Sequence, residues 1–122
     1  PPYFLKNSLA TAYIQLGRYE LAVVELEDLS KQLEGKLHVG SADNLALAYI
    51  YLDVYDKALK TLEKVDAKDD VYGNILKYYV YDKQNNRKKM DEIKSKIPEA
   101  FAVTPALLPQ SGLPGSQLLR LL

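Results

Sequence analysis

One stretch of this chain recurs almost intact. Residues 12–22, AYIQLGRYELA, return 36 positions later as residues 48–58, AYIYLDVYDKA. Both copies carry tyrosine at the same two places and end in alanine. A repeat of roughly 20–50 residues, in which two helices meet at a tight turn, is typical of arrays whose units stack around a shared core. The repeat therefore predicts an all-α array of antiparallel helical hairpins.

The amino-acid composition limits the class of protein that this chain can belong to. A chain of 122 residues with 48% hydrophobic residues is long enough for one domain with its own core. Its 16 basic and 16 acidic residues cancel, so no overall field draws it to nucleic acid or to a membrane. It has no cysteine, which excludes disulfides and cysteine-ligated metal, and no apolar run approaches the roughly 20 residues of a membrane span. Beginning at Pro1 without a methionine, it reads as a piece of a longer protein.

Apolar spacing predicts about six helices, over residues 2–16, 19–33, 41–52, 55–65, 71–83 and 87–97. Gly17 ends the first, because glycine adopts the left-handed cap conformation without penalty. Asp53-Val54 and residues 84–86 carry the next two hairpin turns, since asparagine also tolerates that conformation. Ser41 is the expected cap of the third helix, and the aspartates of residues 66–70 can cap the fifth.

The first predicted helix has apolar residues at i, i+4, i+8 and i+11, which share one face: Leu5, Leu9, Tyr13 and Leu16. In the second helix of each copy, Ala22 and Ala58 mark the point where the two helices of a hairpin cross. A larger side chain there would push the helices apart. The unit near residues 71–97 keeps the hairpin pattern without this alanine. It is expected to cover the apolar face that the second hairpin leaves open.

The sequence offers no pattern for catalysis. Its only histidine, His38, lies in a connector with no catalytic partner at helical spacing. The acidic pairs Asp69-Asp70 and Asp91-Glu92 suit helix capping and solvation. No phosphate-binding glycine loop, metalloprotease motif or nucleophile elbow is present. We therefore expect a non-enzymatic protein that uses no cofactor and no metal.

Charge is unevenly placed along the chain. Residues 20–34 carry a net charge of about −4, and residues 83–96 one of about +4. A solvated face explains each run. For the basic run an acidic protein partner is the next alternative and RNA the last, because its aromatic residues lie on the preceding helix. The opposite signs also allow a second hypothesis, in which copies stack end to end.

The repeated residues resemble those of the tetratricopeptide repeat. The first copy supplies Leu9, Ala10, Tyr13, Gly17, Tyr19, Ala22 and Leu26. The second supplies Leu45, Ala46, Tyr49, Tyr55, Ala58 and Leu62. Both copies lack the family's early tryptophan and closing proline, Asp53 replaces its turn glycine, and the period exceeds the family's 34 residues. The resemblance implies a right-handed superhelix over residues 1–98, built of repeats at about 3–36, 39–70 and 71–98.

In the resembled family, ligands bind on the concave surface formed by the first helix of each hairpin. Carried to this sequence, the partner-binding residues are Asn7, Thr11, Ile14, Gln15, Asn44, Leu47, Ile50, Tyr51, Lys77 and Tyr78. Asp43 would repel a carboxylate there, so an amphipathic or extended peptide fits better than a peptide C-terminus. The resemblance thus implies a non-catalytic scaffold for protein–protein interaction. The alternative is a structural segment of a larger helical array that self-associates end to end.

Residues 99–122 have a different composition, rich in proline, glycine and leucine. From residue 100 onward this stretch contains no Asp, Glu or Lys. It ends in Leu118–Leu122, which matches an LxxLL pattern. Three interpretations stay open: a remnant of cloning, a linker, or a tail that docks on the array's own groove or on a neighbour's. An uncovered leucine segment also favours self-association through this tail.

Overall fold

The computed structural model describes residues 2–65 and 70–98, which form six α-helices and no β-strand. The helices are α1 (Pro2–Gln15), α2 (Tyr19–Gln32), α3 (Val39–Tyr51), α4 (Tyr55–Glu63), α5 (Val71–Lys83) and α6 (Arg87–Lys94). None of these helices is both long enough and apolar enough to cross a bilayer. The all-α prediction is confirmed. The predicted tail, residues 99–122, and most of the predicted 66–70 capping segment lie outside the described residues.

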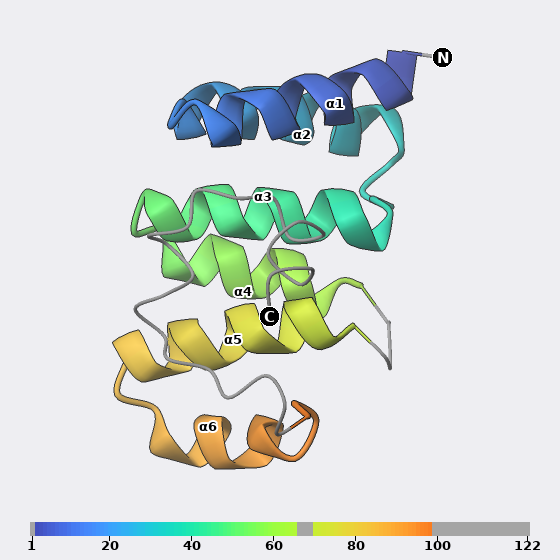
Figure 1. Cartoon of the computed structure of the whole chain (residues 1–122). Helices are drawn as coiled ribbons and strands as arrows, with labels where there is room; N and C mark the ends of the chain where they lie inside the picture. Colours follow the sequence, from blue (N-terminus) through green and yellow to red (C-terminus); the bar gives the residue numbers. More distant parts are fainter. Residues whose placement is uncertain (1, 66–69, 99–122) are drawn as a thin grey trace.

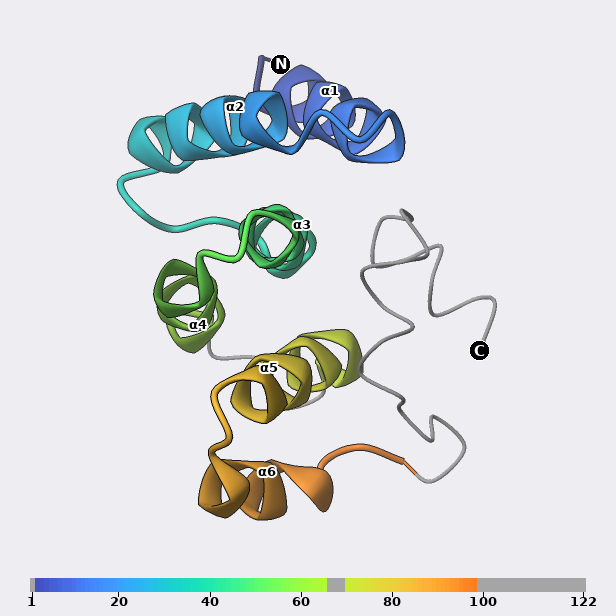
Figure 2. The same cartoon turned by 90° about the vertical axis from the view of Figure 1, so that its left-hand side faces the viewer.

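The helices pair in sequence order and stack as three layers (Figure 1). We call α1 and α2 hairpin 1, α3 and α4 hairpin 2, and α5 and α6 hairpin 3. In Figure 2, α1, α3 and α5 form one column, α2 and α4 form a second column to its left, and α6 lies beneath α5. Hairpins 1 and 3 therefore form the two ends of the stack, and hairpin 2 lies between them.

The three hairpins close with the same turn. Its left-handed residue is Gly17, Asp53 or Asn85, with φ values of 74°, 60° and 55°. The backbone N–H of the next residue donates to the carbonyl five positions back: Arg18 to Tyr13 at 2.8 Å, Val54 to Tyr49 at 2.9 Å and Asn86 to Tyr81 at 2.8 Å. This bond satisfies a carbonyl that the helix end would otherwise leave without a partner. The turn predictions are confirmed, including the non-glycine positions.

Helix starts agree with the sequence analysis in part. Asp70 caps α5 as expected, its Oδ1 accepting from the backbone N–H of Gly73 at 3.0 Å. The prediction that Ser41 caps the third helix is wrong. That helix already begins at Val39, after His38. Ser41 lies inside α3, where its hydroxyl donates to Asn7 Oδ1 at 2.9 Å and ties hairpin 2 to hairpin 1.

Helix α3 is the centre of the core. It contacts α1, α2, α4 and α5, and residues 41–50 are all buried. Ala22 and Ala58 are fully buried on α2 and α4, where their small side chains let the helices approach. On α5, Ile75, Leu76 and Val80 are buried as well. Contacts between hairpins, most of them made through α3, therefore add to the packing within each hairpin, as expected for stacked helical units.

The apolar stripe predicted for the first helix is not the buried face of that helix. Leu5, Leu9 and Leu16 are exposed, whereas Ala10 and Ile14 are fully buried. The reason is the position of α3, which lies against the side of α1 that carries the hydrogen-bonding residues Asn7 and Thr11. Residues two positions apart point to opposite sides of a helix, so Leu9, between these two, faces away from α3. The apolar pattern identified a stripe along one side of the helix, but it could not predict that α3 would pack against a different side.

The helix crossing in hairpin 2 gives a test of this packing. Ala58→Leu adds three carbons at a fully buried position, and overpacking should lower the free energy of unfolding by about 1–3 kcal/mol. Urea denaturation followed by circular dichroism at 222 nm measures the change. The exposed Glu63→Leu on the same helix is the control, expected within about 0.5 kcal/mol of wild type. Equal stability of Ala58→Leu and wild type would contradict the crossing described here.

Candidate functional site

The ten residues predicted to bind a partner come from α1, α3 and α5, which occupy one column of the stack (Figure 2). We call them the first-helix surface. Its members are Asn7, Thr11, Ile14 and Gln15 on α1, Asn44, Leu47, Ile50 and Tyr51 on α3, and Lys77 and Tyr78 on α5. A hydrogen bond joins the α1 and α3 members, because the Asn44 Nδ2 amide donates to Thr11 Oγ1 at 3.4 Å. The seam between hairpins 1 and 2 is therefore polar on this side.

Exposure divides the first-helix surface into two sets. Its three aliphatic members, Ile14, Leu47 and Ile50, belong to the hydrophobic core, and Asn44 is also buried. The partly or fully exposed members are Asn7, Thr11, Gln15, Tyr51, Lys77 and Tyr78. Any partner that meets this surface as described therefore meets amide, hydroxyl, ammonium and aromatic groups.

Tyr51 is held in place by a second tyrosine. Its ring stacks on that of Tyr19, with ring centroids 4.1 Å apart and an angle of 3° between the planes. Tyr19 begins α2 and Tyr51 ends α3, so the stack joins hairpin 1 to hairpin 2. Parallel stacking fixes the orientation of Tyr51 and occupies one of its faces.

A buried acidic pair lies where α3 meets α5. Asp43 is only 5% exposed, and its carboxyl lies beside that of Asp70, the N-cap of α5. Both carboxyls converge on Gly73: a β-carbon at that position would collide with Asp70 Oδ2 and would lie 3.1 Å from Asp43 Oδ1. The absence of a side chain at Gly73 is what gives the two acids room.

Burial and the neighbouring acid raise the pKa of Asp43 to about 9. Lys77 opposes this only in part. At neutral pH Asp43 is therefore protonated, and its O–H donates to Asp70. Tyr72 lies on the same helix as Gly73 and is 2% exposed. Burial raises the pKa of its hydroxyl, and the neighbouring Asp43 and Asp70 add to that rise. In the described part of the chain, the Tyr72 hydroxyl and Asp43 Oδ1 are buried and have no hydrogen-bond partner.

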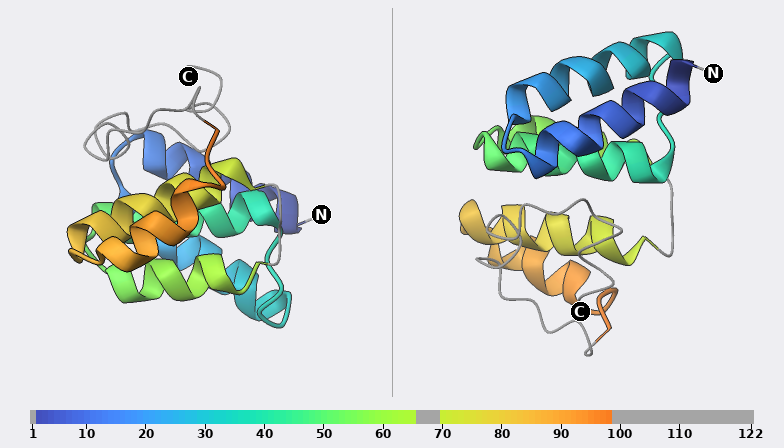
Figure 3. Two further views of the ribbon diagram at one scale, coloured as in Figure 1. Left: turned by 90° about the horizontal axis from the view of Figure 1, so that it is seen from below. Right: turned by 45° about the horizontal axis from the view of Figure 1, so that its top comes forward.

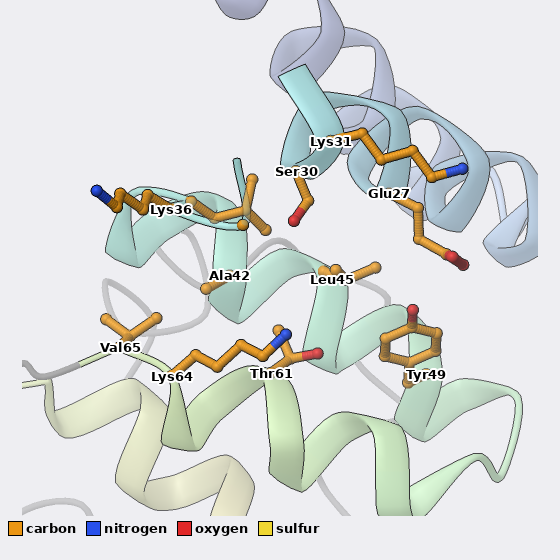
Figure 4. Close-up of a pocket in the computed structure, with 12 residues that line it drawn as sticks. Glu27, Ser30, Lys31, Lys36, Ala42, Leu45, Tyr49, Thr61, Lys64 and Val65 are labelled. Atoms are coloured by element: carbon orange, nitrogen blue, oxygen red, sulfur yellow. The ribbon is translucent and has the colours of Figure 1, made fainter. Parts of the chain in front are cut away.

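A pocket of about 420 Å³ opens between hairpins 1 and 2, on the side of α2 and α4 (Figure 4). Its apolar part consists of Leu37, Ala42, Leu45 and Val65. Its polar part consists of Ser30, Thr61, Glu27, Tyr49, Lys31, Lys36 and Lys64. The Lys64 ammonium points into the pocket beside Thr61, and the Lys31 and Lys36 side chains extend outward at its edges (Figure 4). Three lysines against one glutamate favour an anionic group over this opening.

Glu27 lies at one end of this pocket, near the hydroxyl of Tyr49 (Figure 4). Burial, together with the Glu27 carboxylate, raises the pKa of Tyr49 to about 12. The phenol is therefore neutral at physiological pH and can donate to the carboxylate. This end of the pocket links α2 to α3 and gives the repeated tyrosine a structural role.

Sequence reasoning missed the acidic pair and the pocket. It assigned Asp70 only to helix capping and noted Asp43 only as a repulsive charge. The available signal was Gly73, a glycine inside a predicted helix and three residues after an aspartate. The pocket had no sequence signal, because its residues come from α2, α3, α4 and the connector before α3. Within the described residues, no three His, Cys, Asp or Glu side chains gather as a metal site requires.

Comparison with known proteins adds no assignment. A scan against protein-family models, a search of curated proteins and a search of solved structures each found no match.

The first prediction from the acidic pair concerns Gly73. In an open helix, replacing glycine by alanine gains up to about 1 kcal/mol. Gly73→Ala should instead lower the free energy of unfolding by about 1–3 kcal/mol, because its methyl group collides with Asp70. Gly40→Ala on α3 is the matched control: it meets nothing within 4 Å and should leave stability unchanged or raise it. If both variants gain stability in urea denaturation, the acids do not crowd Gly73.

The acidic pair should also make the stability of the protein depend on pH. The pKa of Asp43 rises from its ordinary 3.8 to about 9 on folding, so the folded state keeps a proton that the unfolded state releases. Stability contributed by this proton is complete below pH 3.8 and declines as pH rises toward 9. Asp43→Asn should flatten the decline and raise the free energy of unfolding at pH 8 by at least about 1.4 kcal/mol, the equivalent of one pKa unit.

Urea denaturation of Asp43→Asn and wild type at pH 4, 6 and 8 measures this difference. Asp91→Asn, at an exposed position of α6, is the control and should follow the wild-type curve. Parallel curves for wild type and Asp43→Asn across the range would show that Asp43 is ionised in the folded state.

Proposed function

We propose that this chain is a non-catalytic module for protein–protein interaction that binds a partner peptide on the first-helix surface. The observation that carries the proposal is the column formed by α1, α3 and α5 (Figure 2), the three helices to which the exposed polar and aromatic members of the first-helix surface belong. Stacked helical units use such extended surfaces for binding. The repeated turn, with the same left-handed residue and hydrogen bond in each hairpin, supports a tetratricopeptide-like superhelix.

The chemistry of the exposed members indicates the kind of peptide. Asn7, Thr11 and Gln15 offer amide and hydroxyl groups that can pair with an extended peptide backbone. Lys77 offers a cation, and Tyr51 and Tyr78 offer aromatic area with a polar tip. An extended peptide with an acidic residue near α5 fits these groups. The buried Ile14, Leu47 and Ile50 serve to hold α1 and α3 in register beneath it.

Selection from a phage-displayed random peptide library tests this proposal. Peptides recovered on the wild-type protein should lose at least about tenfold in affinity when Lys77→Glu is introduced, because the cation becomes an anion. Lys60→Glu, at an exposed position of α4 in the other column, makes the same charge change and should leave affinity within about twofold. Fluorescence anisotropy with labelled peptides measures both.

Two results would contradict the proposal. One is a set of selected peptides whose affinities fall with Lys60→Glu and not with Lys77→Glu, which would move binding to the α2 and α4 column. The other is no enrichment of peptides over rounds of selection on folded protein.

A further inference from the structure

The end of the stack formed by hairpin 1 carries an apolar patch. Its members are Leu5 and Leu9 on α1, Leu16 directly after α1, and Leu21 and Val24 on α2, with exposed fractions between 42% and 71%. Hairpin 1 presents these helices side by side as one outer layer (Figure 3). We call this set the outer face of hairpin 1. The outermost units of helical arrays ordinarily have a polar outer face, because they meet water.

The two apolar stripes form one surface. On α2, Leu21, Val24 and Asp28 fall at i, i+3 and i+7, so Asp28 continues the α2 stripe. Asp28 Oδ2 lies 2.6 Å from the ammonium of Lys6, and Lys6 neighbours Leu9 at i+3 on α1. This ion pair therefore connects the two stripes where α1 meets α2.

The internal repeat shows what covers this face in hairpin 2. Shifting by 36 residues takes Leu5 to Ser41 and Leu9 to Leu45. Ser41 is bonded to Asn7 of hairpin 1, and Leu45 lines the seam with α2. Leu45 is 4% exposed, whereas Leu9 is 42% exposed. The covering element on hairpin 2 is a helix of the neighbouring hairpin.

The charge of hairpin 1 also restricts what kind of molecule can cover its outer face. Helix α2 contains four acidic residues and one basic residue, Lys31, and Lys6 of α1 lies 3.8 Å from Glu25 and 2.6 Å from Asp28, so the acidic groups still outnumber the basic ones by four to two. Two copies meeting through this face would bring their acidic α2 helices together, which is unfavourable. Stacking end to end would place the face on hairpin 3, where the described residues include no large exposed hydrophobic side chain to match it. A second copy therefore fits neither way.

We propose that the outer face of hairpin 1 docks an amphipathic helix of a partner protein, with an apolar stripe flanked by lysine or arginine. The helix packs across Leu5, Leu9, Leu21 and Val24 as α2 packs on α3, and its basic residues meet Asp28 and Glu25, the acidic residues of α2 that lie beside Lys6 at this face. This interaction uses a surface separate from the first-helix surface, so one protein can hold two partners at once.

The probe is a synthetic helix the length of α2, 14 residues. It is stapled to hold its helical form, with leucines at i, i+3, i+4 and i+7 and lysines on both flanks. Fluorescence anisotropy should show saturable binding to the wild-type protein. Leu9→Lys should weaken binding at least about tenfold, because it places a charge at the centre of the patch and faces the lysines of the probe. The site is exposed, so this variant should keep the wild-type circular dichroism spectrum.

Three controls separate this interaction from others. Val39→Lys, at another exposed apolar position, should leave probe affinity within about twofold. A probe with glutamates in place of lysines should bind at least about tenfold more weakly. Lys77→Glu should not change probe affinity, so failure of this inference and failure of the proposed peptide site are distinguishable.

Equal probe affinities of Leu9→Lys and wild type would overturn the proposal. It would also be overturned by sedimentation velocity showing a wild-type dimer that Leu9→Lys dissociates, because the face would then be covered by a second copy.

Discussion

A backbone constraint at three positions sets the form of this molecule. At each hairpin turn, one residue must adopt the left-handed conformation so that the next N–H can reach back to the carbonyl of a repeated tyrosine. Glycine meets this requirement once, and Asp53 and Asn85 meet it at small steric cost. With that bond in place, the second helix starts at once and runs back along the first. The apolar sides of each pair can meet only because the turn has this geometry.

The position of a unit in the stack then decides how its residues are used. Hairpin 2 has neighbours on both sides, so its first helix is buried along ten consecutive residues and even encloses a protonated acid. Hairpin 1 has a neighbour on one side only, and the leucine that repeats as Leu45 is left in water as Leu9. The same sequence pattern therefore builds core in hairpin 2 and leaves an exposed apolar face on hairpin 1.

The dependence of burial on neighbouring hairpins determines which features could be predicted from the sequence alone. The turns, the order of the helices and the Asp70 cap depend on local rules, and these predictions are confirmed, whereas the predicted Ser41 cap is wrong because α3 begins two residues earlier, at Val39. Which stripe of α1 is buried depends on where α3 lies, and a period within one helix holds no information about its neighbours. For this reason Ile14, Leu47 and Ile50, which were predicted to bind a partner, lie in the core. In the same way, Asp43 meets Asp70 only because hairpins 2 and 3 are packed together.

The stacked rings of Tyr19 and Tyr51 have a practical consequence. The chain contains 10 tyrosines and no tryptophan, so its near-ultraviolet spectrum comes almost entirely from phenol rings. Rings 4.1 Å apart and nearly parallel couple their electronic transitions, and this pair exists only while α2 and α3 are docked. Far-ultraviolet ellipticity, by contrast, follows helix content whether or not the hairpins touch. The molecule thus carries a built-in optical reporter of the seam between its first two units, readable without any added label.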